Sequence, residues 1–169
     1  MNRMIACSVG FIVLGCVLDQ TGLAQDKASP QELVQKVQEA AASLAKSGES
    51  GVAAFNTKSA PWVWKDTFVV VLDCGKGIMA ANPIKPELVG KPLASLKDAK
   101  GNPAFELLCA AAKSPNGVWA EWAVPKPGEK DPSRKVSYGY AAKGTDYVVG
   151  AGVFDPQAQI SDLEKLSTK

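Results

Sequence analysis

Apolar residues recur at helical spacing near the start of the chain. Ser29-Pro30-Gln31-Glu32 favours a helix start, because Ser29 can accept backbone N–H groups, Pro30 fits the first helical position and Glu32 completes a capping box. An apolar stripe follows, made of Leu33, Val34, Val37, Ala40, Ala41 and Leu44. Ser47-Gly48 favours a stop. We predict a long helix whose stripe packs on its own sheet, with a dimer seam as the alternative.

Further along, apolar and alternating segments bounded by glycine and proline predict strands. The five segments are 68–73, 77–82, 118–124, 134–142 and 146–154. Residues 51–66 read as irregular. Asn102-Pro103 favours a helix to about residue 113, and Asp155-Pro156 a short C-terminal helix to about residue 166. Strands in runs separated by a helix, without strict β-α alternation, indicate the α+β class with one antiparallel sheet.

Alternation along the segment 134–142 divides its side chains between two faces of the sheet. One face takes Val136, Tyr138 and Tyr140, and the other takes Lys135, Ser137 and Gly139. In the last segment, Gly150 and Gly152 share a face with Val148 and Phe154. Residues as small as glycine let another group approach the sheet closely.

Composition limits the function. The 169 residues suffice for one domain with a core, and a net charge of +2 from scattered basic residues gives no nucleic-acid footprint. Histidine is absent, which excludes Ser-His-Asp and Cys-His catalysis and histidine metal sites. The carboxylates are dispersed along the sequence. We therefore expect no metal and no cofactor.

The N-terminus is typical of an export signal spanning residues 1–24. An apolar run too short for a comfortable membrane span follows Arg3, and Gly22-Leu23-Ala24 is a small-residue cleavage site. One alternative is a lipoprotein signal with Cys16 lipidated, and another is an uncleaved anchor. Both cleavage near Ala24 and lipidation of Cys16 would place a single domain, residues 29–169, in the periplasm or outside the cell.

Cysteines are few. Cys7 and Cys16 fall in the signal, which leaves Cys74 and Cys109 in the domain. Two cysteines in an oxidising compartment often pair, although spacing alone cannot show that they come close enough. The alternative is two small buried apolar side chains. No Cys-x-x-Cys spacing supports a redox-active pair.

The order of motifs then points to a family. After the long helix come Asp73-Cys74-Gly75-Lys76-Gly77, Ala81-Asn82-Pro83, Leu88-Val89-Gly90-Lys91, Gly117-Val118-Trp119, Trp122-Ala123-Val124-Pro125, Lys135-Val136-Ser137-Tyr138 and Gly150-Ala151-Gly152-Val153-Phe154. Each is only a turn or strand signature, and the ordered combination carries the information. Over residues 31–155 the chain resembles the single Cache domains of the second type, which are PAS-like in fold. The family often has histidine where this sequence has Asn82.

The resemblance implies a pocket on one side of the sheet for a small molecule, often a short organic acid. Large amphipathic side chains suit its walls: Trp62, Trp64, Trp119, Trp122, Tyr138 and Tyr140. A lysine could pair with a carboxylate as a point charge. The predicted ligand-binding residues are Trp62, Trp64, Tyr138 and Lys135, followed by Asn82 and Lys85. The competing interpretation places the aromatic residues in the core, and Lys135 and Tyr138 have opposite parity on a regular strand.

The sequence thus predicts an exported, non-enzymatic module that binds a small ligand, with an organic acid as the expected class. Receptors of this family transmit through a membrane helix to an output domain. The chain ends at Lys169 without either, so we expect signalling to need a membrane partner, and a homodimer through the first helix is one expected assembly. The alternatives are a thiol-dependent enzyme using Cys74 or Cys109 and a structural envelope protein without a ligand.

Overall fold

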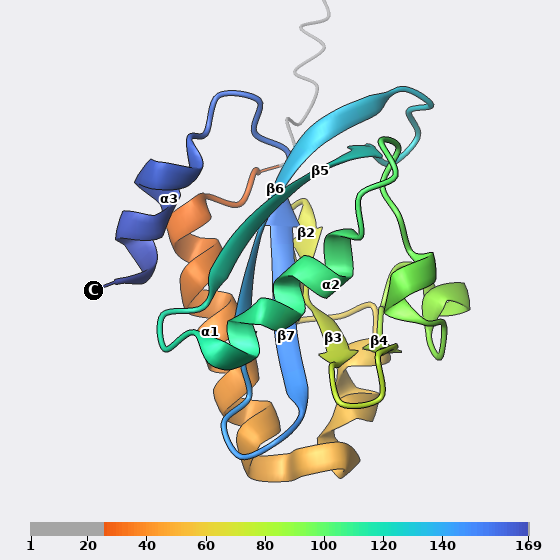
Figure 1. Cartoon of the computed structure of the whole chain (residues 1–169), viewed down its shortest axis with the longest axis vertical. Coiled ribbons are helices and arrows are strands. Elements are labelled where there is room, and N and C mark those ends of the chain that lie inside the picture. Colours follow the sequence, from red (N-terminus) through yellow and green to blue (C-terminus); the bar gives the residue numbers. More distant parts are fainter. Residues whose placement is uncertain (1–25, 169) are drawn as a thin grey trace, which may run out of the picture.

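A five-stranded antiparallel sheet with helices on both faces forms the centre of the computed structural model, which describes residues 26–168 (Figure 1). Its strands are β3 (Val70–Asp73), β4 (Ile78–Ala81), β5 (Val118–Pro125), β6 (Pro132–Ala141) and β7 (Tyr147–Val153). They lie in the order β4-β3-β7-β6-β5, which places the last strand in the middle. All seven residues of β7 are buried. The predicted α+β class and five-stranded sheet are confirmed.

Helix α1 (Pro30–Ser47) covers one face of the sheet. Its predicted capping box is present: Glu32 N–H donates to Ser29 Oγ (3.2 Å), and Ser29 N–H donates to Glu32 Oε2 (2.9 Å). The helix ends at Gly48, whose φ of 58° is easily reached without a side chain. The apolar stripe is buried against β6 and β7. It therefore packs on its own sheet, the first of the two interpretations.

Between α1 and β3 the chain is more regular than we predicted. A 3₁₀ helix, η1 (Gly48–Asn56), precedes a small two-stranded sheet of β1 (Val63–Trp64) and β2 (Thr67–Phe68). The prediction of one strand over 68–73 was wrong, because β2 pairs with β1 whereas β3 pairs with β7. Thr67 Oγ1 donates to the carbonyl of Gly152 (2.8 Å), which fixes this hairpin against the end of β7.

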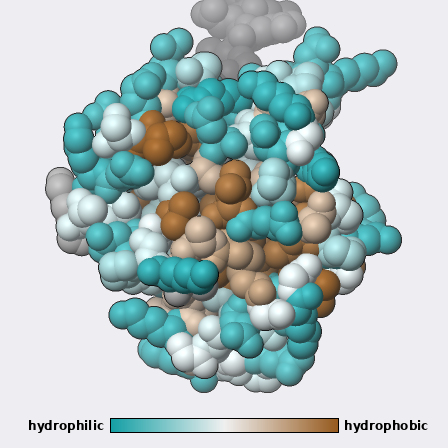
Figure 2. Space-filling model, in the orientation of Figure 1, coloured by the Kyte–Doolittle hydropathy of each residue, from teal (hydrophilic) through white to brown (hydrophobic). Residues whose placement is uncertain are grey.

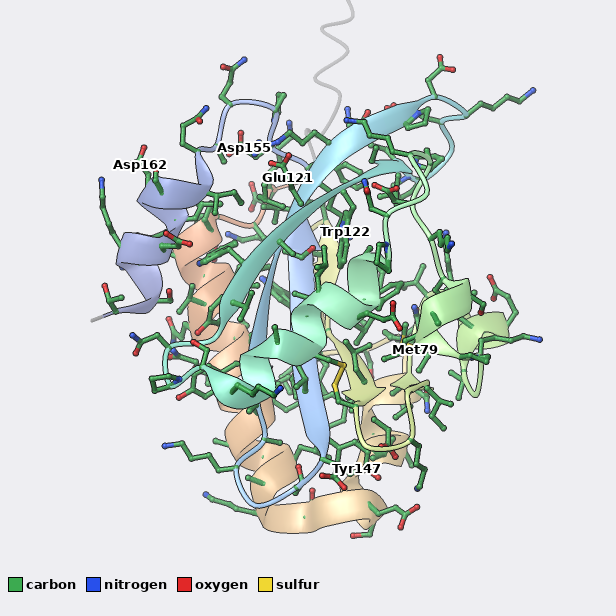
Figure 3. All side chains as sticks on the ribbon, viewed as in Figure 1. Met79, Glu121, Trp122, Tyr147, Asp155 and Asp162 are labelled. Carbon is green, nitrogen blue, oxygen red and sulfur yellow. A yellow bond between two sulfur atoms is a disulfide. The ribbon has the colours of Figure 1, made fainter. Side chains whose placement is uncertain are left out.

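The opposite face carries short helices: η2 (Pro86–Leu88), η3 (Leu93–Ser95), α2 (Ala104–Cys109) and η4 (Ala110–Lys113). Helix α2 packs on β5, β6 and β7. Asn102 does not cap it, contrary to prediction. Instead the backbone and side-chain nitrogens of Asn102 donate to the Asp98 carboxylate (2.8 and 3.1 Å). A disulfide between Cys74 and Cys109 joins the end of β3 to the end of α2 (Figure 3).

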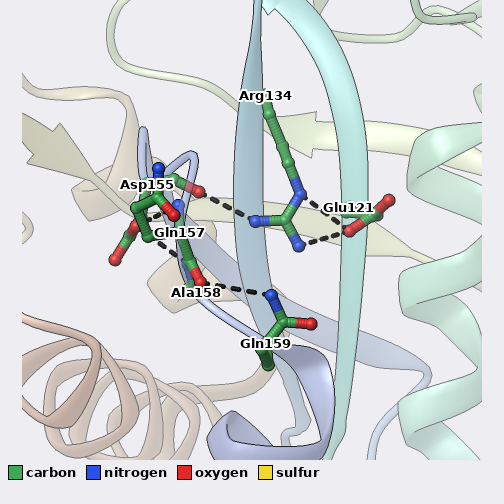
Figure 4. A network of polar contacts seen from close by, with 6 residues as sticks. All are labelled: Glu121, Arg134, Asp155, Gln157, Ala158 and Gln159. Carbon is green, nitrogen blue, oxygen red and sulfur yellow. Dashed lines mark hydrogen bonds and ion pairs between the residues drawn. The ribbon is translucent and has the colours of Figure 1, made fainter.

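The C-terminal helix α3 (Ile160–Ser167) starts later than predicted and packs beside α1. Asp155 is not its cap, because Asp155 Oδ1 accepts from the N–H groups of Gln157 and Ala158 in the preceding turn (2.9 and 3.0 Å; Figure 4). Arg134 supports this turn from β6. Its Nη1 donates to the Asp155 carbonyl (2.9 Å) and its Nε to Glu121 Oε2 (2.9 Å).

The sheet separates two apolar clusters. The cluster on the α1 side includes Leu33, Leu44, Phe55, Trp119, Val136 and Tyr138. The cluster on the α2 side includes Val70, Leu72, Met79, Leu93, Leu108 and Trp122. No helix within residues 26–168 has the length and apolar character to cross a bilayer. The predicted signal at 1–24 and the alternative lipidated Cys16 lie outside the described residues.

Candidate functional site

A cavity of about 580 Å³ lies on the α2 face of the sheet. Strands β6 and β7 supply its floor, and α2, the segment after β4 and the β5–β6 link border it. Its apolar lining includes Phe68, Phe105, Leu108, Trp122 and Phe154. Figure 2 shows apolar side chains gathered in the middle of this face and bordered by hydrophilic ones. The volume is within the roughly 300–1,000 Å³ typical of small-molecule sites.

Lys135 places a positive charge at this cavity. It lies on β6, and its Nζ is 5.2 Å from the ring centres of both Phe68 and Phe154. Desolvation, reinforced by repulsion from Lys85 and partly offset by Asp66, lowers the pKa of Lys135 to about 8. None of the ion pairs among the described residues includes Lys135. An ammonium group that has lost water without gaining a counter-ion is unfavourable, and a bound anion would relieve that cost.

Two glycines of β7 create the room that Lys135 and its neighbours occupy. A Cβ at Gly152 would overlap Ser137 Oγ and lie 2.9 Å from Lys135 Cε. A Cβ at Gly150 would lie 3.0 Å from Leu108 Cδ1, the side chain that α2 lays over the sheet. The predicted close approach at these glycines is confirmed, and it positions the floor of the cavity.

Asn82 also lines the cavity, directly after β4. Its side chain is buried, and Oδ1 accepts from the N–H groups of Ile84 (3.2 Å) and Lys85 (2.8 Å). Its own N–H donates to Asn56 Oδ1 (3.0 Å). These bonds build the turn that brings Lys85 to the cavity. Asn82 therefore shapes one wall through the backbone.

The structure brings together only part of the residue set predicted from sequence. Lys135, Asn82 and Lys85 line the cavity, whereas Trp62, Trp64 and Tyr138 do not. Tyr138 is buried in the cluster on the α1 side, and the half-buried Trp62 and Trp64 pack against that cluster, so these three predicted contacts lie outside this cavity.

Hydrogen bonding and stacking account for two of these side chains, Tyr138 and Trp62, whereas the buried Nε1 of Trp64 has no hydrogen-bond partner among the described residues. Tyr138 is fully buried, and its hydroxyl donates to the Asn116 carbonyl (2.6 Å). Burial raises the pKa of Tyr138 to about 12. Trp62 stacks on Phe55 with ring centres 5.1 Å apart.

Among the cavity residues absent from the predicted binding set are Phe68, Trp122, Ser137 and Phe154. Trp122 had been considered as a wall residue, and strand alternation gave a signal for Ser137 and Phe154. Ser137 shares a face with Lys135, and Phe154 shares a face with the two glycines. Trp122 was grouped with Trp119, but the two are three positions apart on β5, and the structure places them on opposite faces of the sheet.

Cys74 and Cys109 are joined to each other, so neither is a free thiol, and the thiol-dependent alternative has no nucleophile in residues 26–168. The same residues hold no group of three or more cysteine, aspartate or glutamate side chains placed to bind a metal ion. The arrangement is suited to binding.

Comparison with known proteins gives concordant matches. Residues 20–163 match the family model of single Cache domain 2. Over 85 residues the chain is 29% identical to the methyl-accepting chemotaxis protein McpP of Pseudomonas putida, an alignment that covers 49% of this chain and 16% of that protein. The chain thus spans well under half of this relative.

Two solved structures share the fold. One is a periplasmic sensor domain of a chemotaxis protein, with a TM-score of 0.54 and 21% identity over 73% of this chain and 89% of that one. The other is a Cache chemosensory domain whose structure was solved to explain carboxylic acid recognition. It has a TM-score of 0.55 and 20% identity over 73% of this chain and 87% of that one. The Cache, PAS-like fold expected from the sequence is confirmed.

Proposed function

Because the chain belongs to the single Cache domain 2 family, whose members are ligand-binding sensory modules, we propose that it binds a small organic carboxylate without catalysis. The ligand occupies the cavity on the α2 face of the sheet. Its carboxylate pairs with Lys135, and its short apolar part lies among the aromatic side chains of the wall.

The observation that carries this proposal is the unpaired ammonium of Lys135. Its position over two rings gives a cation–π attraction of about 0.5–2 kcal/mol, which leaves the charge un-neutralised. A ligand carboxylate would supply the missing counter-ion in a partly dehydrated site, where ion pairing is stronger than in water. The related Cache structure that concerns carboxylic acid recognition supports the same ligand class.

The walls indicate a small ligand. Phe68, Phe154 and Trp122 border the same cavity as the ammonium, and Trp122 is held in place by the Phe105 ring with centres 5.2 Å apart. Rigid apolar walls of this kind select ligands by shape, whereas a lone lysine selects only by charge. We therefore propose selection for a carboxylate with a short apolar substituent.

The proposed location is outside the cytoplasm, through a signal at residues 1–24 cleaved near Ala24 or through lipidation of Cys16. The related periplasmic sensor domain supports this compartment. We propose that the bound state is read by a membrane signalling protein, as expected for a module related to a chemotaxis receptor. A homodimer is the proposed alternative route for transmitting the signal.

Isothermal titration calorimetry with acetate, propionate and the neutral amide propionamide tests the proposal. Wild type is expected to bind the carboxylates and not the amide. Lys135→Met keeps the length of the side chain and removes its charge, and should weaken carboxylate binding by about 10- to 100-fold, the range for a charge-assisted hydrogen bond. Lys143→Met, in the exposed β6–β7 turn, is the matched control.

Stability separates loss of the site from loss of the fold. Lys135→Met removes a desolvated charge, so the free variant should melt at or above the temperature of wild type. Equal affinity of wild type and Lys135→Met for carboxylates would refute the proposed site. Equal binding of propionamide and propionate would refute the ligand class.

A further inference from the structure

Ser137 is a buried polar side chain on the cavity floor without a partner. It is 1% exposed, and its Oγ forms no hydrogen bond among the described residues. Buried side-chain polar atoms are paired in the large majority of cases, and an unpaired one destabilises the folded state. An alanine at position 137 would therefore destabilise the folded state less than this unpaired serine does.

The position of Ser137 links it to Lys135. The two residues lie two apart on β6, so both side chains project from the same face of the sheet. On the neighbouring strand β7, Gly152 is paired with Ser137, whose Oγ fills the space that a Cβ at Gly152 would take, and Lys135 Cε lies 2.9 Å from that Cβ position. The hydroxyl and the lysine side chain are therefore close together on the cavity floor, so one bound group can contact the hydroxyl and the ammonium together.

We propose that Ser137 is a second ligand contact, which donates a hydrogen bond to one carboxylate oxygen while Lys135 pairs with the other. This inference rests on the proposed function and adds a specificity-determining residue to it. A lysine attracts any anion from many directions, whereas a hydroxyl at a fixed position on a buried strand favours a group with a second oxygen at the right place. The pair thus selects carboxylates over single-point anions such as chloride.

An ordered water would also satisfy this hydroxyl, and the two occupants differ in their consequence for affinity. With a ligand contact, Ser137→Ala removes a hydrogen bond to a charged group and should weaken binding of acetate and propionate about tenfold or more. If the hydroxyl instead contacts only a water, Ser137→Ala should bind acetate and propionate with the affinity of wild type. The melting temperature of the free protein should stay the same or rise, because the variant removes an unpaired buried hydroxyl.

The chain offers a matched control on the same strand. Ser133 lies on the same face of β6 four residues earlier and is outside the cavity, so Ser133→Ala should leave affinity unchanged. Ser137→Cys is a second variant that preserves the size of the side chain and replaces a good donor by a weak one. It should lose affinity as Ser137→Ala does.

The outcomes separate this inference from the proposed function. Wild-type affinity in Ser137→Ala, together with lost affinity in Lys135→Met, would overturn the role of Ser137 and leave the lysine site intact. Should Ser137→Ala fail to fold, full affinity in Ser137→Cys would overturn the inference equally. Failure of wild type to bind either carboxylate would overturn both proposals.

Discussion

The ammonium of Lys135 lies 5.2 Å from the centre of the Phe154 ring, at the end of the central strand. Phe154 precedes the turn at Asp155, whose carbonyl accepts a hydrogen bond from Arg134, and Arg134 is in turn paired with Glu121 (Figure 4). The charge of Lys135 is thus positioned by aromatic faces and not by a carboxylate. This relationship leaves the cation available to a ligand, and the predictions below depend on it.

The first prediction concerns pH. Desolvation and the nearby Lys85 lower the pKa of Lys135 to about 8, and an anion binds the protonated form. Carboxylate affinity should therefore be constant between pH 6 and 7 and fall as the pH rises through about 8, approaching a tenfold loss per further pH unit. Calorimetry from pH 6 to 9.5 measures this, with Lys135→Met as the control that should lack the transition.

The same shift predicts the stability of the free protein. The pKa of Lys135 in the folded state is below its unfolded value of about 10.4, so the folded state is penalised wherever the lysine is charged. The contribution of Lys135 to unfolding free energy should rise as the pH increases from about 8 to about 10. For the binding experiment, a carboxylate affinity that stays constant from pH 6 to pH 9.5 would contradict the lowered pKa of Lys135.

A second prediction separates the two faces of the sheet. Tyr138→Phe removes the hydrogen bond to the Asn116 carbonyl on the α1 side and should lower the unfolding free energy by about 1 kcal/mol. Carboxylate binding should be unchanged. Trp122→Leu, on the cavity side, should weaken binding because it removes part of the wall. Urea unfolding and calorimetry on both variants test this, and lost binding in Tyr138→Phe alone would contradict the assigned face.

A third prediction concerns the disulfide between Cys74 and Cys109. It closes a loop with a sequence separation of 35, for which loop-entropy arguments give about 4 kcal/mol of stabilisation as an upper estimate. The double variant Cys74→Ser, Cys109→Ser should unfold at lower urea concentration than wild type, by about 2–4 kcal/mol. Wild type with a reductant should match it. Identical urea midpoints would show that the bond contributes little.

Much of the fold could be predicted because its signals are local. The capping box at Ser29 and the glycine at 48 define α1 without reference to the sheet. The boundary between β2 and β3 was harder to predict, because it depends on which strand each segment pairs with: β2 pairs with β1, and β3 pairs with β7. The roles of Asn102 and Asp155 failed for a similar reason. Both side chains form local turns where the sequence suggested helix caps.

The site was harder to predict than the fold. Strand parity correctly assigned Lys135 and Tyr138 to opposite faces, but nothing in the sequence says which face carries the cavity. That depends on how α1 and α2 divide the sheet. Aromatic size favoured Trp62 and Trp64, which pack half-buried against the cluster on the α1 side. The sequence placed Ser137 on the same face as Lys135, but its unpaired hydroxyl becomes visible only once its neighbours are placed.

The most direct test of the central claim is a crystal structure of the protein with propionate. We predict that the carboxylate lies in the cavity on the α2 face, with one oxygen about 2.7–3.2 Å from Lys135 Nζ. Ligand density on the α1 side beside Tyr138 and Trp64, or in the cavity without contact to Lys135, would contradict the account.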